Sequence, residues 1–341
     1  MELRTNDFNY SLPPELIAQV PVEPRDSARL MVIHRDSGQL EHKNFTDLPS
    51  YLKAGDVLVF NDSRVIPARL AGKKSGTGGN VEILLLKRLG PHIWETLVKP
   101  GKRIHKGAQL EFDCNVNAEV TEEKDEGIRT VVFSDEARLS MLGEIALPPY
   151  IHVPLSNSDR YQTIYADSPG SVAAPTAGLH FTERLLKQIQ DIGVKCVFVT
   201  LHIGLDTFRP VKEEDPRHHH IHREYGCVGE AAAAEISRAK KEGNRVICVG
   251  TTSVRLVEEA ARYGTPPDIP PFDGGWVELF ILPGFQFRAT DAMITNFHLP
   301  CSTLLMLVSA FAGHELINKA YQEAIEQKYR FFSFGDATLI I

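Results

Sequence analysis

Hydrophobic and polar positions follow three different patterns along the 341-residue chain. Residues 1–63 open with LPPELIA, which predicts a short helix after prolines, and continue with the apolar runs RLMVIH and DVLVFND, which predict strands. Residues 64–154 contain short β-type runs separated by breaks such as KSGTGGN and KPGKR. Short strands at this spacing indicate a small antiparallel β-barrel.

Residues 155–341 alternate strands with amphipathic helices. TERLLKQIQDIG predicts a helix with Thr182 as its N-cap, and VKCVFVTLHIG is apolar enough to predict a strand buried on both faces. The same alternation continues through EAAAAEISRAKKEG, NRVICVG, TSVRLVEEAARYG, WVELFI, DAMITNF, STLLMLVSAFA, ELINKAYQEAIEQK and YRFFSF. The pattern predicts a layered α/β domain with a mainly parallel sheet, made of residues 1–63 and 155–341 and interrupted by the barrel.

The composition is that of a soluble globular protein, with 43% hydrophobic and 24% charged residues. The N-terminus lacks the apolar core of a signal peptide, and no apolar run approaches the roughly 18 residues of a membrane span, so we expect a cytoplasmic protein. Five cysteines without C-x-x-C spacing argue against disulfides and a structural zinc site. No coiled-coil pattern appears, which favours a monomer.

Charge is distributed unevenly around the formal net value of −7. Residues 64–106 contain ten Lys and Arg residues and two acidic residues, a local balance of +8, so the remainder carries −15. A basic segment on an acidic body can bind phosphates, although lysines on solvated strand faces give the same pattern. The sequence leaves both interpretations open at this point.

Ligands of such α/β sheets bind beyond the carboxyl ends of the strands, which makes polar strand-to-helix turns the first candidate sites. In VICVGTTSVRLVE, the residues Thr251, Thr252 and Ser253 follow a strand, and Arg255 lies one turn into the next helix. A helix N-terminus favours anions and electron-rich atoms. Capping explains one hydroxyl group but not this whole set. The turn is neither G-x-G-x-x-G nor a Walker loop, so no dinucleotide cofactor is indicated.

Two further turns contain histidine. In SVAAPTAGLHFTERLL, Thr176 and the backbone near Gly178 can hold a ligand, while His180 between apolar residues is also typical of a structural histidine. In MITNFHLPCSTLL, Asn296 and His298 can contact a nucleobase or a ribose hydroxyl group. An Asx turn at Asn296 and a helix cap at Ser302 are the structural alternatives.

A smaller cluster, VFNDSRVIPARL, places Asn61, Asp62 and Arg64 at the start of the barrel segment. An ion pair between Asp62 and Arg64 is the simplest explanation, and their position at the junction of two domains favours a functional one.

The segment EEDPRHHHIHREYG contains four histidines. On a strand, His220, His222 and Glu224 would share one face, which is a spacing that can bind zinc. An internal position argues against an affinity tag. Residues 218 and 219 are expected to be solvated.

Several of these segments together resemble the S-adenosylmethionine:tRNA ribosyltransferase-isomerase family of queuosine synthesis. The resemblance extends over nearly the whole chain and rests on YSLPPELIAQ, RDSARLMVI, FNDSRVIPARL, APTAGLHFT, VTLHIGLDTFRPV, VGTTSVR, TNFHLPCSTLLMLVSAF and RFFSFGDATLI. Family members also carry an H-x-M-H-x-E element, in which this chain has Ile221 in place of methionine.

The resemblance implies an α/β domain interrupted by a β-barrel, and an enzyme without a metal or redox cofactor. Such an enzyme uses S-adenosylmethionine as a co-substrate and transfers and isomerises its ribosyl unit onto 7-aminomethyl-7-deazaguanine in tRNA. The products are epoxyqueuosine-tRNA, adenine and methionine. This chemistry needs a base for the acidic C5′ proton, an acid for the departing adenine and a neutral amine.

We therefore expect His180 or His298 to act as the base, and Asp62 or Glu224 to act on the amine or the sulfonium. The catalytic candidates are His180, His298, Asp62, Glu224 and His222. The substrate-binding candidates are Asn61, Arg64, Thr176, Gly178, His202, Thr251, Thr252, Ser253, Arg255, Asn296 and Ser302. The candidates for contacts with tRNA phosphates are Lys73, Lys74, Lys102 and Arg103. No metal ligand is assigned.

Two alternatives belong to other classes of protein. A tRNA methyltransferase would release S-adenosylhomocysteine instead of adenine, and would usually show a glycine-rich turn after its first strand. A non-catalytic RNA-binding module would rely on a basic and aromatic surface. The sequence shows no such glycine-rich turn, and an acidic chain with polar groups gathered in strand-to-helix turns fits an RNA-binding module poorly.

Overall fold

A computed structural model describes residues 3–124, 127–204 and 210–341, which form two compact units. Unit 1 consists of Met1–Arg64, Pro148–Ser168 and Ala174–Ile341, and unit 2 of Val65–Leu147 and Pro169–Ala173. The sequence-based limits of 64–154 for the barrel domain stay a prediction. Residues 205–209, which belong to the motif VTLHIGLDTFRPV, lie outside the described part of the chain.

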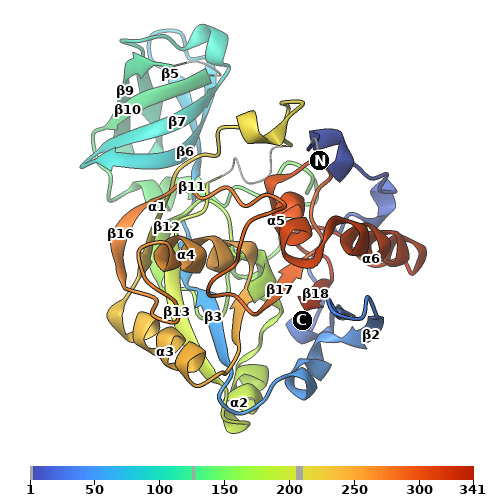
Figure 1. Cartoon of the computed structure of the whole chain (residues 1–341). Coiled ribbons are helices and arrows are strands. Elements are labelled where there is room, and N and C mark those ends of the chain that lie inside the picture. Colours follow the sequence, from blue (N-terminus) through green and yellow to red (C-terminus); the bar gives the residue numbers. More distant parts are fainter. Residues whose placement is uncertain (1–2, 125–126, 205–209) are drawn as a thin grey trace. The chain divides into compact units, whose positions relative to one another are not determined.

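Unit 1 is built on a sheet of nine strands within the described residues, in the order β16-β14-β13-β3-β15-β17-β18-β1-β2 (Figure 1). The strands are β1 (Arg29–Ile33), β2 (Leu40–Asn44), β3 (Val57–Asn61), β13 (Lys195–Leu201), β14 (Glu224–Val228), β15 (Val246–Val249), β16 (Phe272–Val277), β17 (Ala292–Asn296) and β18 (Ala337–Ile340). Parallel pairs are β13–β3, β3–β15, β15–β17 and β1–β18. The pairs β16–β14, β14–β13, β17–β18 and β1–β2 are antiparallel.

This sheet confirms the layered α/β class, but it is mixed rather than mainly parallel. Hydrophobic periodicity reports which faces of a strand are buried and not the direction of the strand. The antiparallel pairs lie mainly toward the two ends of the sheet, outside the parallel strands β13, β3, β15 and β17.

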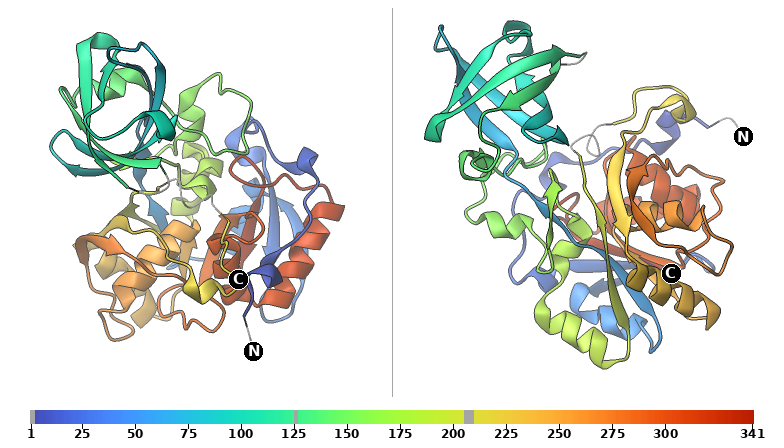
Figure 2. Two further views of the ribbon diagram at one scale, coloured as in Figure 1. Left: turned by 90° about the horizontal axis from the view of Figure 1, so that it is seen from above. Right: turned by 90° about the vertical axis from the view of Figure 1, so that its left-hand side faces the viewer.

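Helices cover the two faces of the sheet, as Figures 1 and 2 show. They are α2 (Glu183–Asp191), α3 (Glu230–Lys241), α4 (Thr251–Ala261), α5 (Thr303–Ala312) and α6 (His314–Glu326). Alternate residues of β3 enter different cores: Val57 and Val59 pack with α3 to α6, whereas Leu58 and Phe60 pack with α2. The predicted N-cap of α2 is confirmed, because Thr182 Oγ1 accepts from the backbone of Leu185 at 3.2 Å.

Several local expectations were wrong. Strand β13 is not buried on both faces, since Phe198 is 42% exposed. YRFFSF forms no strand, and the last strand lies further on, in β18. LPPELIA forms only a 3₁₀ turn at Pro14–Leu16, and WVELFI contributes only the end of β16. Short apolar runs of this kind are shaped by tertiary packing more than by their own periodicity.

Unit 2 is an antiparallel barrel, as predicted. Its sheet has the order β11-β5-β6-β7-β10-β9-β8, and an additional β5–β8 pairing closes it. The strands are β5 (Arg69–Lys74), β6 (Asn80–Gly90), β7 (Ile93–Lys99), β8 (Gln109–Phe112), β9 (Val116–Glu123), β10 (Ile128–Phe133) and β11 (Gly143–Glu144). Helix α1 (Leu139–Leu142) belongs to the same unit. Strands β4 (Ser63–Val65) and β12 (Ser168–Ser171) pair with each other where the chain passes between the units.

None of the helices in the described ranges is both long enough and apolar enough to cross a membrane.

Candidate functional site

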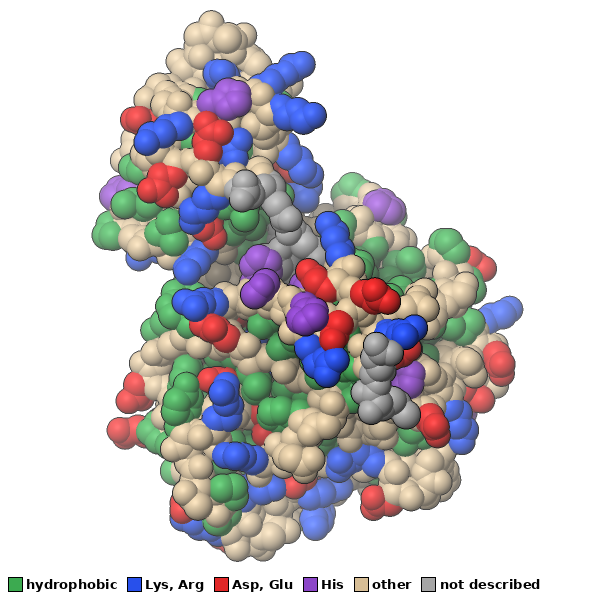
Figure 3. All heavy atoms as spheres, turned by 45° about the horizontal axis from the view of Figure 1, so that its top comes forward, with side chains coloured by type: hydrophobic (Ala, Val, Ile, Leu, Met, Phe, Trp, Pro, Cys, Tyr) green, Lys and Arg blue, Asp and Glu red, His purple; other side chains and the backbone are tan. Residues whose placement is uncertain are grey.

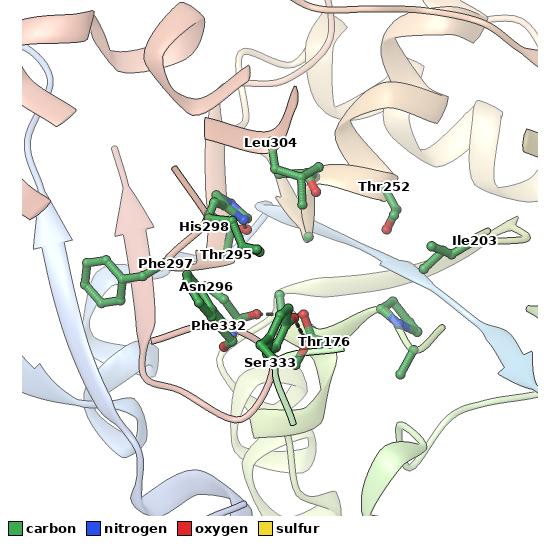
Figure 4. Close-up of a pocket in the computed structure, with 17 residues that line it drawn as sticks. Thr176, Ile203, Thr252, Thr295, Asn296, Phe297, His298, Leu304, Phe332 and Ser333 are labelled. Atoms are coloured by element: carbon green, nitrogen blue, oxygen red, sulfur yellow. Dashed lines mark hydrogen bonds between the residues drawn. The ribbon is translucent and has the colours of Figure 1, made fainter. Parts of the chain in front are cut away.

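A pocket in unit 1 lies at the carboxyl ends of β15 and β17 (Figure 4). The three predicted turns converge on it. Its lining residues are Tyr150, Ala174, Pro175, Thr176, Ala177, Ile203, Gly250, Thr251, Thr252, Thr295, Asn296, Phe297, His298, Leu299, Leu304, Phe332 and Ser333. Five of the predicted site residues are therefore brought together: Thr176, Thr251, Thr252, Asn296 and His298.

The turn after β15 presents a helix N-terminus to this pocket. Gly250 occupies the N-cap of α4 with a φ of 87°, and no side chain caps the helix. The capping explanation for Thr251 and Thr252 is therefore not what the structure shows. Ser253 has a different role, because its buried hydroxyl group donates to the Val249 carbonyl at 2.8 Å. The pocket thus receives two threonines at the positive end of a helix dipole.

The side chain of Asn296 is fixed on three sides. Its Oδ1 accepts from Thr176 Oγ1 at 3.1 Å, while its Nδ2 donates to the Phe332 carbonyl at 3.2 Å and to Nε2 of His180 at 3.3 Å. The Phe332 carbonyl can only accept, so the amide orientation is determined and His180 Nε2 must be the unprotonated nitrogen. A hydrogen bond to the Arg25 backbone uses the other side of the ring.

His180 lies outside the pocket lining, behind Asn296, with its ring centroid 4.9 Å from that of Phe45. Burial, together with the positive charge of Arg330, lowers the pKa of His180 to about 4. The imidazole is therefore neutral at neutral pH, which suits its role as acceptor from Asn296.

His298 lines the pocket and is held through its backbone. Its N–H donates to the hydroxyl group of Tyr321 at 2.9 Å, and its carbonyl accepts from that of Tyr10 at 2.5 Å. Its Nε2 lies 3.1 Å from Thr295 Oγ1. Burial lowers the pKa of His298 to about 3. Both predicted bases are neutral at pH 7, and only His298 lines the pocket.

These two histidines should make the protein less stable in acid. The unfolded chain binds protons near the usual pKa of 6.5, whereas the folded pKa values are about 4 and about 3. The free energy of unfolding is therefore unaffected by these histidines above about pH 6.5. It falls as the pH drops from there toward the folded pKa values, by up to about 1.4 kcal/mol per pH unit for each histidine. Urea unfolding of wild type and His298→Gln between about pH 7 and about pH 5 checks this. We expect a shallower loss in the variant, and identical losses would contradict it.

Glu224 and Arg255 form a buried ion pair and do not line the pocket. Glu224 Oε1 also accepts from the Gly204 backbone at 3.1 Å, and Arg255 Nε donates to the Leu279 carbonyl at 3.1 Å. The two charges compensate each other, as buried ions require. His222, which was expected to accompany Glu224, is exposed.

The histidine run does not form a metal cluster. Across residues 3–124, 127–204 and 210–341, no group of three or more His, Cys, Asp or Glu side chains is arranged to hold a metal ion. His219 pairs with Glu213 at 2.8 Å and packs against Phe280, so the expectation that it is solvated was wrong. His218 and His220 are exposed.

The junction residues do not line the pocket themselves, but Asn61 Nδ2 donates to Oγ1 of the pocket-lining Thr252 at 3.4 Å. Asn61 is buried and bonds to both the N–H and the carbonyl of Leu201, which ties the end of β3 to the end of β13. Asp62 accepts from Thr200 Oγ1 at 2.6 Å, and burial raises its pKa. Arg64 is exposed and donates to the Ala166 carbonyl at 3.4 Å.

Gly178 and Ser302 have structural roles, and neither they nor His202 line the pocket. A Cβ at Gly178 would lie 2.0 Å from the Tyr165 hydroxyl group, so glycine is needed there for space. Ser302 caps α5, since it accepts from the Leu305 backbone at 3.1 Å and donates to the Leu299 carbonyl at 2.7 Å. Burial lowers the pKa of His202, whose Nδ1 has no hydrogen-bond partner among the described residues.

Sequence reasoning missed the segment around Phe332 and Ser333. The Ser333 hydroxyl group lies 2.7 Å from that of Tyr150, and both residues line the pocket together with Phe332. Phe332 has a φ of 70°, which is uncommon for a bulky residue and concentrates at functional sites. The only available signal was the motif RFFSFGDATLI, which local patterning interpreted as a strand.

The four predicted tRNA-contacting residues lie together in unit 2. Lys73 and Lys74 end β5, and Lys102 and Arg103 belong to the 3₁₀ turn Gly101–Arg103. Lys74 Nζ donates to the Arg103 carbonyl at 3.0 Å, which joins the two segments. The unit as a whole is not basic, because Val65–Leu147 contains twelve Lys and Arg residues and twelve Asp and Glu residues. Figure 3 shows blue and red side chains interspersed on it.

The structure is that of an α/β protein with an inserted antiparallel barrel and a polar pocket at the carboxyl ends of its strands. The family model described as queuosine biosynthesis protein matches residues 5–340, and the chain belongs to this family. The S-adenosylmethionine:tRNA ribosyltransferase-isomerase of Dehalococcoides mccartyi (strain CBDB1) is 56% identical to it over 344 residues, which cover 99% of this chain and all of the relative. The protein of the same name from Symbiobacterium thermophilum is 54% identical over 345 residues, with the same coverage.

A solved structure agrees with these relatives. The crystal structure of S-adenosylmethionine tRNA ribosyltransferase from Thermotoga maritima is 39% identical in sequence, covers 98% of this chain and 100% of its own, and superimposes with a TM-score of 0.58. The resemblance inferred from the motifs is therefore confirmed.

Proposed function

We propose that this protein transfers and isomerises the ribosyl unit of S-adenosylmethionine onto 7-aminomethyl-7-deazaguanine in tRNA. The products are epoxyqueuosine-tRNA, adenine and methionine. Full-length similarity to ribosyltransferase-isomerases supports this activity. The structural observation that carries it is the convergence of Thr176, Thr251, Thr252, Asn296 and His298 on one pocket. S-adenosylmethionine serves as a co-substrate.

Within this pocket, the α4 N-terminus suits the electron-rich groups of the co-substrate. Thr251 and Thr252 provide hydroxyl groups there, and the helix dipole favours a carboxylate such as that of methionine. Asn296 Oδ1 and Thr176 Oγ1, which are already hydrogen-bonded to each other, keep lone pairs that can accept from a sugar hydroxyl group or a base amino group. Phe332 and Leu304 supply the apolar surface that a nucleoside needs.

We assign the base to His298 and not to His180. Both histidines are neutral, and only His298 lines the pocket, so His298 is the one placed to accept the C5′ proton that the sulfonium makes acidic. The burial that keeps it neutral also makes it a weaker base than an exposed histidine. His180 acts through Asn296 and is a positioning residue. Glu224 and Arg255 neutralise each other, so Asp62, which lies outside the pocket lining and whose pKa is raised by burial, is the remaining predicted carboxylate for the amine.

Adenine release tests the proposal directly. Incubation with S-adenosylmethionine and tRNA that carries the aminomethyl-deazaguanine should release free adenine and methionine, and omission of the tRNA should abolish the release. A methyltransferase would instead yield S-adenosylhomocysteine, and a non-catalytic RNA-binding protein would yield neither product. Either outcome would overturn the proposal.

The four basic residues at the β5 end should contribute to tRNA binding through phosphates. Reversing Lys73 and Lys102 to Glu should weaken tRNA binding and lower the slope of log K against log salt by roughly one for each lost contact. Lys187→Glu is the matched control, because Lys187 is 77% exposed and lies in unit 1 on α2. An unchanged slope in the barrel variants would show that these lysines are only solvated.

We also propose that the protein is a monomer and that it works in the cytoplasm, as the sequence predicts.

A further inference from the structure

Three aromatic side chains, of which two are exposed and one is half-buried, form a row across neighbouring strands of unit 1. Tyr225 on β14 is paired with Trp276 on β16, and they are 43% and 41% exposed. His202, directly after β13, extends the row, because its N–H donates to the Tyr225 carbonyl at 2.9 Å. We call these three residues the aromatic row. All three belong to unit 1, so the row does not depend on the barrel.

The three rings form a corner. The planes of the His202 and Tyr225 rings differ by 13°, with centroids 6.3 Å apart. The Trp276 ring stands at 73° to that of Tyr225, with centroids 5.6 Å apart. Tyr225 and Trp276 therefore form an edge-to-face pair with exposed ring area, and the His202 ring lies parallel to that of Tyr225. This shape accommodates a planar ring by stacking and edge contact.

The backbone fixes this arrangement. Gly226, the next residue on β14, points the other way, where a Cβ would lie 2.7 Å from Leu256 of α4. Tyr225 must therefore project from the opposite face. Gly274 on β16 has a φ of 88°, and a Cβ there would lie 2.2 Å from the Tyr225 hydroxyl oxygen. This glycine leaves the space in which the Tyr225 ring lies, so the row is already formed without a ligand.

The surroundings of the row carry one compensated ion pair and two further acidic groups. Arg223 lies just before β14 and Glu278 just after β16. They form an ion pair with 2.6 Å between Arg223 Nε and Glu278 Oε1. Burial and then the negative charges of Asp273 and Asp62 raise the pKa of Cys227, which lies two residues after Tyr225 on β14. Such surroundings do not attract phosphates. They favour a ligand that is held by its ring face, which is how unpaired RNA bases bind to Tyr, Trp and His side chains.

The row also connects to the pocket. Ile203, the residue that follows His202, is one of the pocket-lining residues. We propose that the aromatic row binds an unpaired base of the anticodon loop by stacking, while the neighbouring nucleotide enters the pocket. This inference rests on the proposed tRNA substrate, and it assigns the specific recognition of the loop to unit 1.

Tryptophan fluorescence tests the inference. The chain has two tryptophans, so Trp94→Phe leaves Trp276 as the only one. Titration with a seven-nucleotide anticodon-loop RNA should then quench the fluorescence in a saturable manner, because a stacked base quenches an indole. Trp94 is buried in the barrel and donates to Glu136 at 2.8 Å. If this variant is unstable, the kinetic variants below carry the test.

Trp276→Ala and Tyr225→Ala should each raise the KM for tRNA roughly tenfold, which is within the range measured for losing one stacked base. The KM for S-adenosylmethionine and the salt dependence should stay unchanged. Tyr263→Ala is the matched control, because Tyr263 is 69% exposed but stacks on Phe272 at the other end of β16. It should have no effect.

Two results would overturn the inference. One is an unchanged KM for tRNA in both row variants. The other is a concentration-dependent dimer of the wild type that Trp276→Ala abolishes, since a second copy of the chain would then cover the row. A wild-type protein that releases no adenine, together with quenching of the Trp94→Phe variant by the loop RNA, would refute the proposed function and leave the base-binding row intact.

Discussion

Replacing His298 with alanine should reduce adenine release by roughly a hundredfold to ten-thousandfold, the range that a positioned general base contributes. The side chain lines the pocket, and burial holds its pKa at about 3, so the free protein presents an unprotonated imidazole at neutral pH. The loss should appear in kcat, since the base acts on the C5′ proton after S-adenosylmethionine has bound. Single-turnover measurement of adenine formation checks this.

Binding and folding controls separate this effect from simple disruption. S-adenosylmethionine should bind His298→Ala with nearly unchanged affinity. His298→Gln keeps much of the side-chain volume and should be about as slow as the alanine variant. His314→Gln is the matched control, because His314 packs against Phe8 and is not a pocket-lining residue. Near-normal turnover by a folded His298→Gln would remove the base assignment.

The sequence predicts the architecture here because the two units follow different hydrophobic periods. Barrel strands such as β7 and β9 alternate buried and more exposed residues, whereas β15 and β17 are buried throughout and lie next to helical segments. Strand direction was not predictable in the same way. β1 and β18 pair in parallel although they come from opposite ends of the chain, and no local pattern encodes such a partnership.

The candidate site could be predicted where it depends on topology. Thr251 and Asn296 follow adjacent parallel strands, so their turns had to meet at one edge of the sheet. Arg255 shows where this reasoning fails. It follows Thr251 by one helical turn, yet its guanidinium group is directed to Glu224, which precedes it by 31 residues. A buried cation is placed by its counter-charge, and that partner cannot be identified from spacing.

The two histidines that the sequence could not rank are separated by their contacts. His180 should affect the reaction only through Asn296, and this predicts a specific pattern in a double-mutant cycle. His180→Ala leaves the Asn296 amide with one fewer acceptor, so the amide can turn away from the orientation that its bonds to Thr176 and Phe332 define. We expect adenine release to fall roughly tenfold to a hundredfold in His180→Ala and at least as far in Asn296→Ala.

The double variant should then be no slower than Asn296→Ala alone, because the interaction that His180 supports is already absent. Multiplicative losses would show that His180 contacts the reacting groups itself. His180→Gln adds an independent criterion: the glutamine carbonyl can accept from Asn296, and its amide can replace the hydrogen bond to the Arg25 backbone. Recovery of most of the activity in His180→Gln, without recovery in His180→Leu, identifies a positioning residue, since glutamine cannot serve as a base.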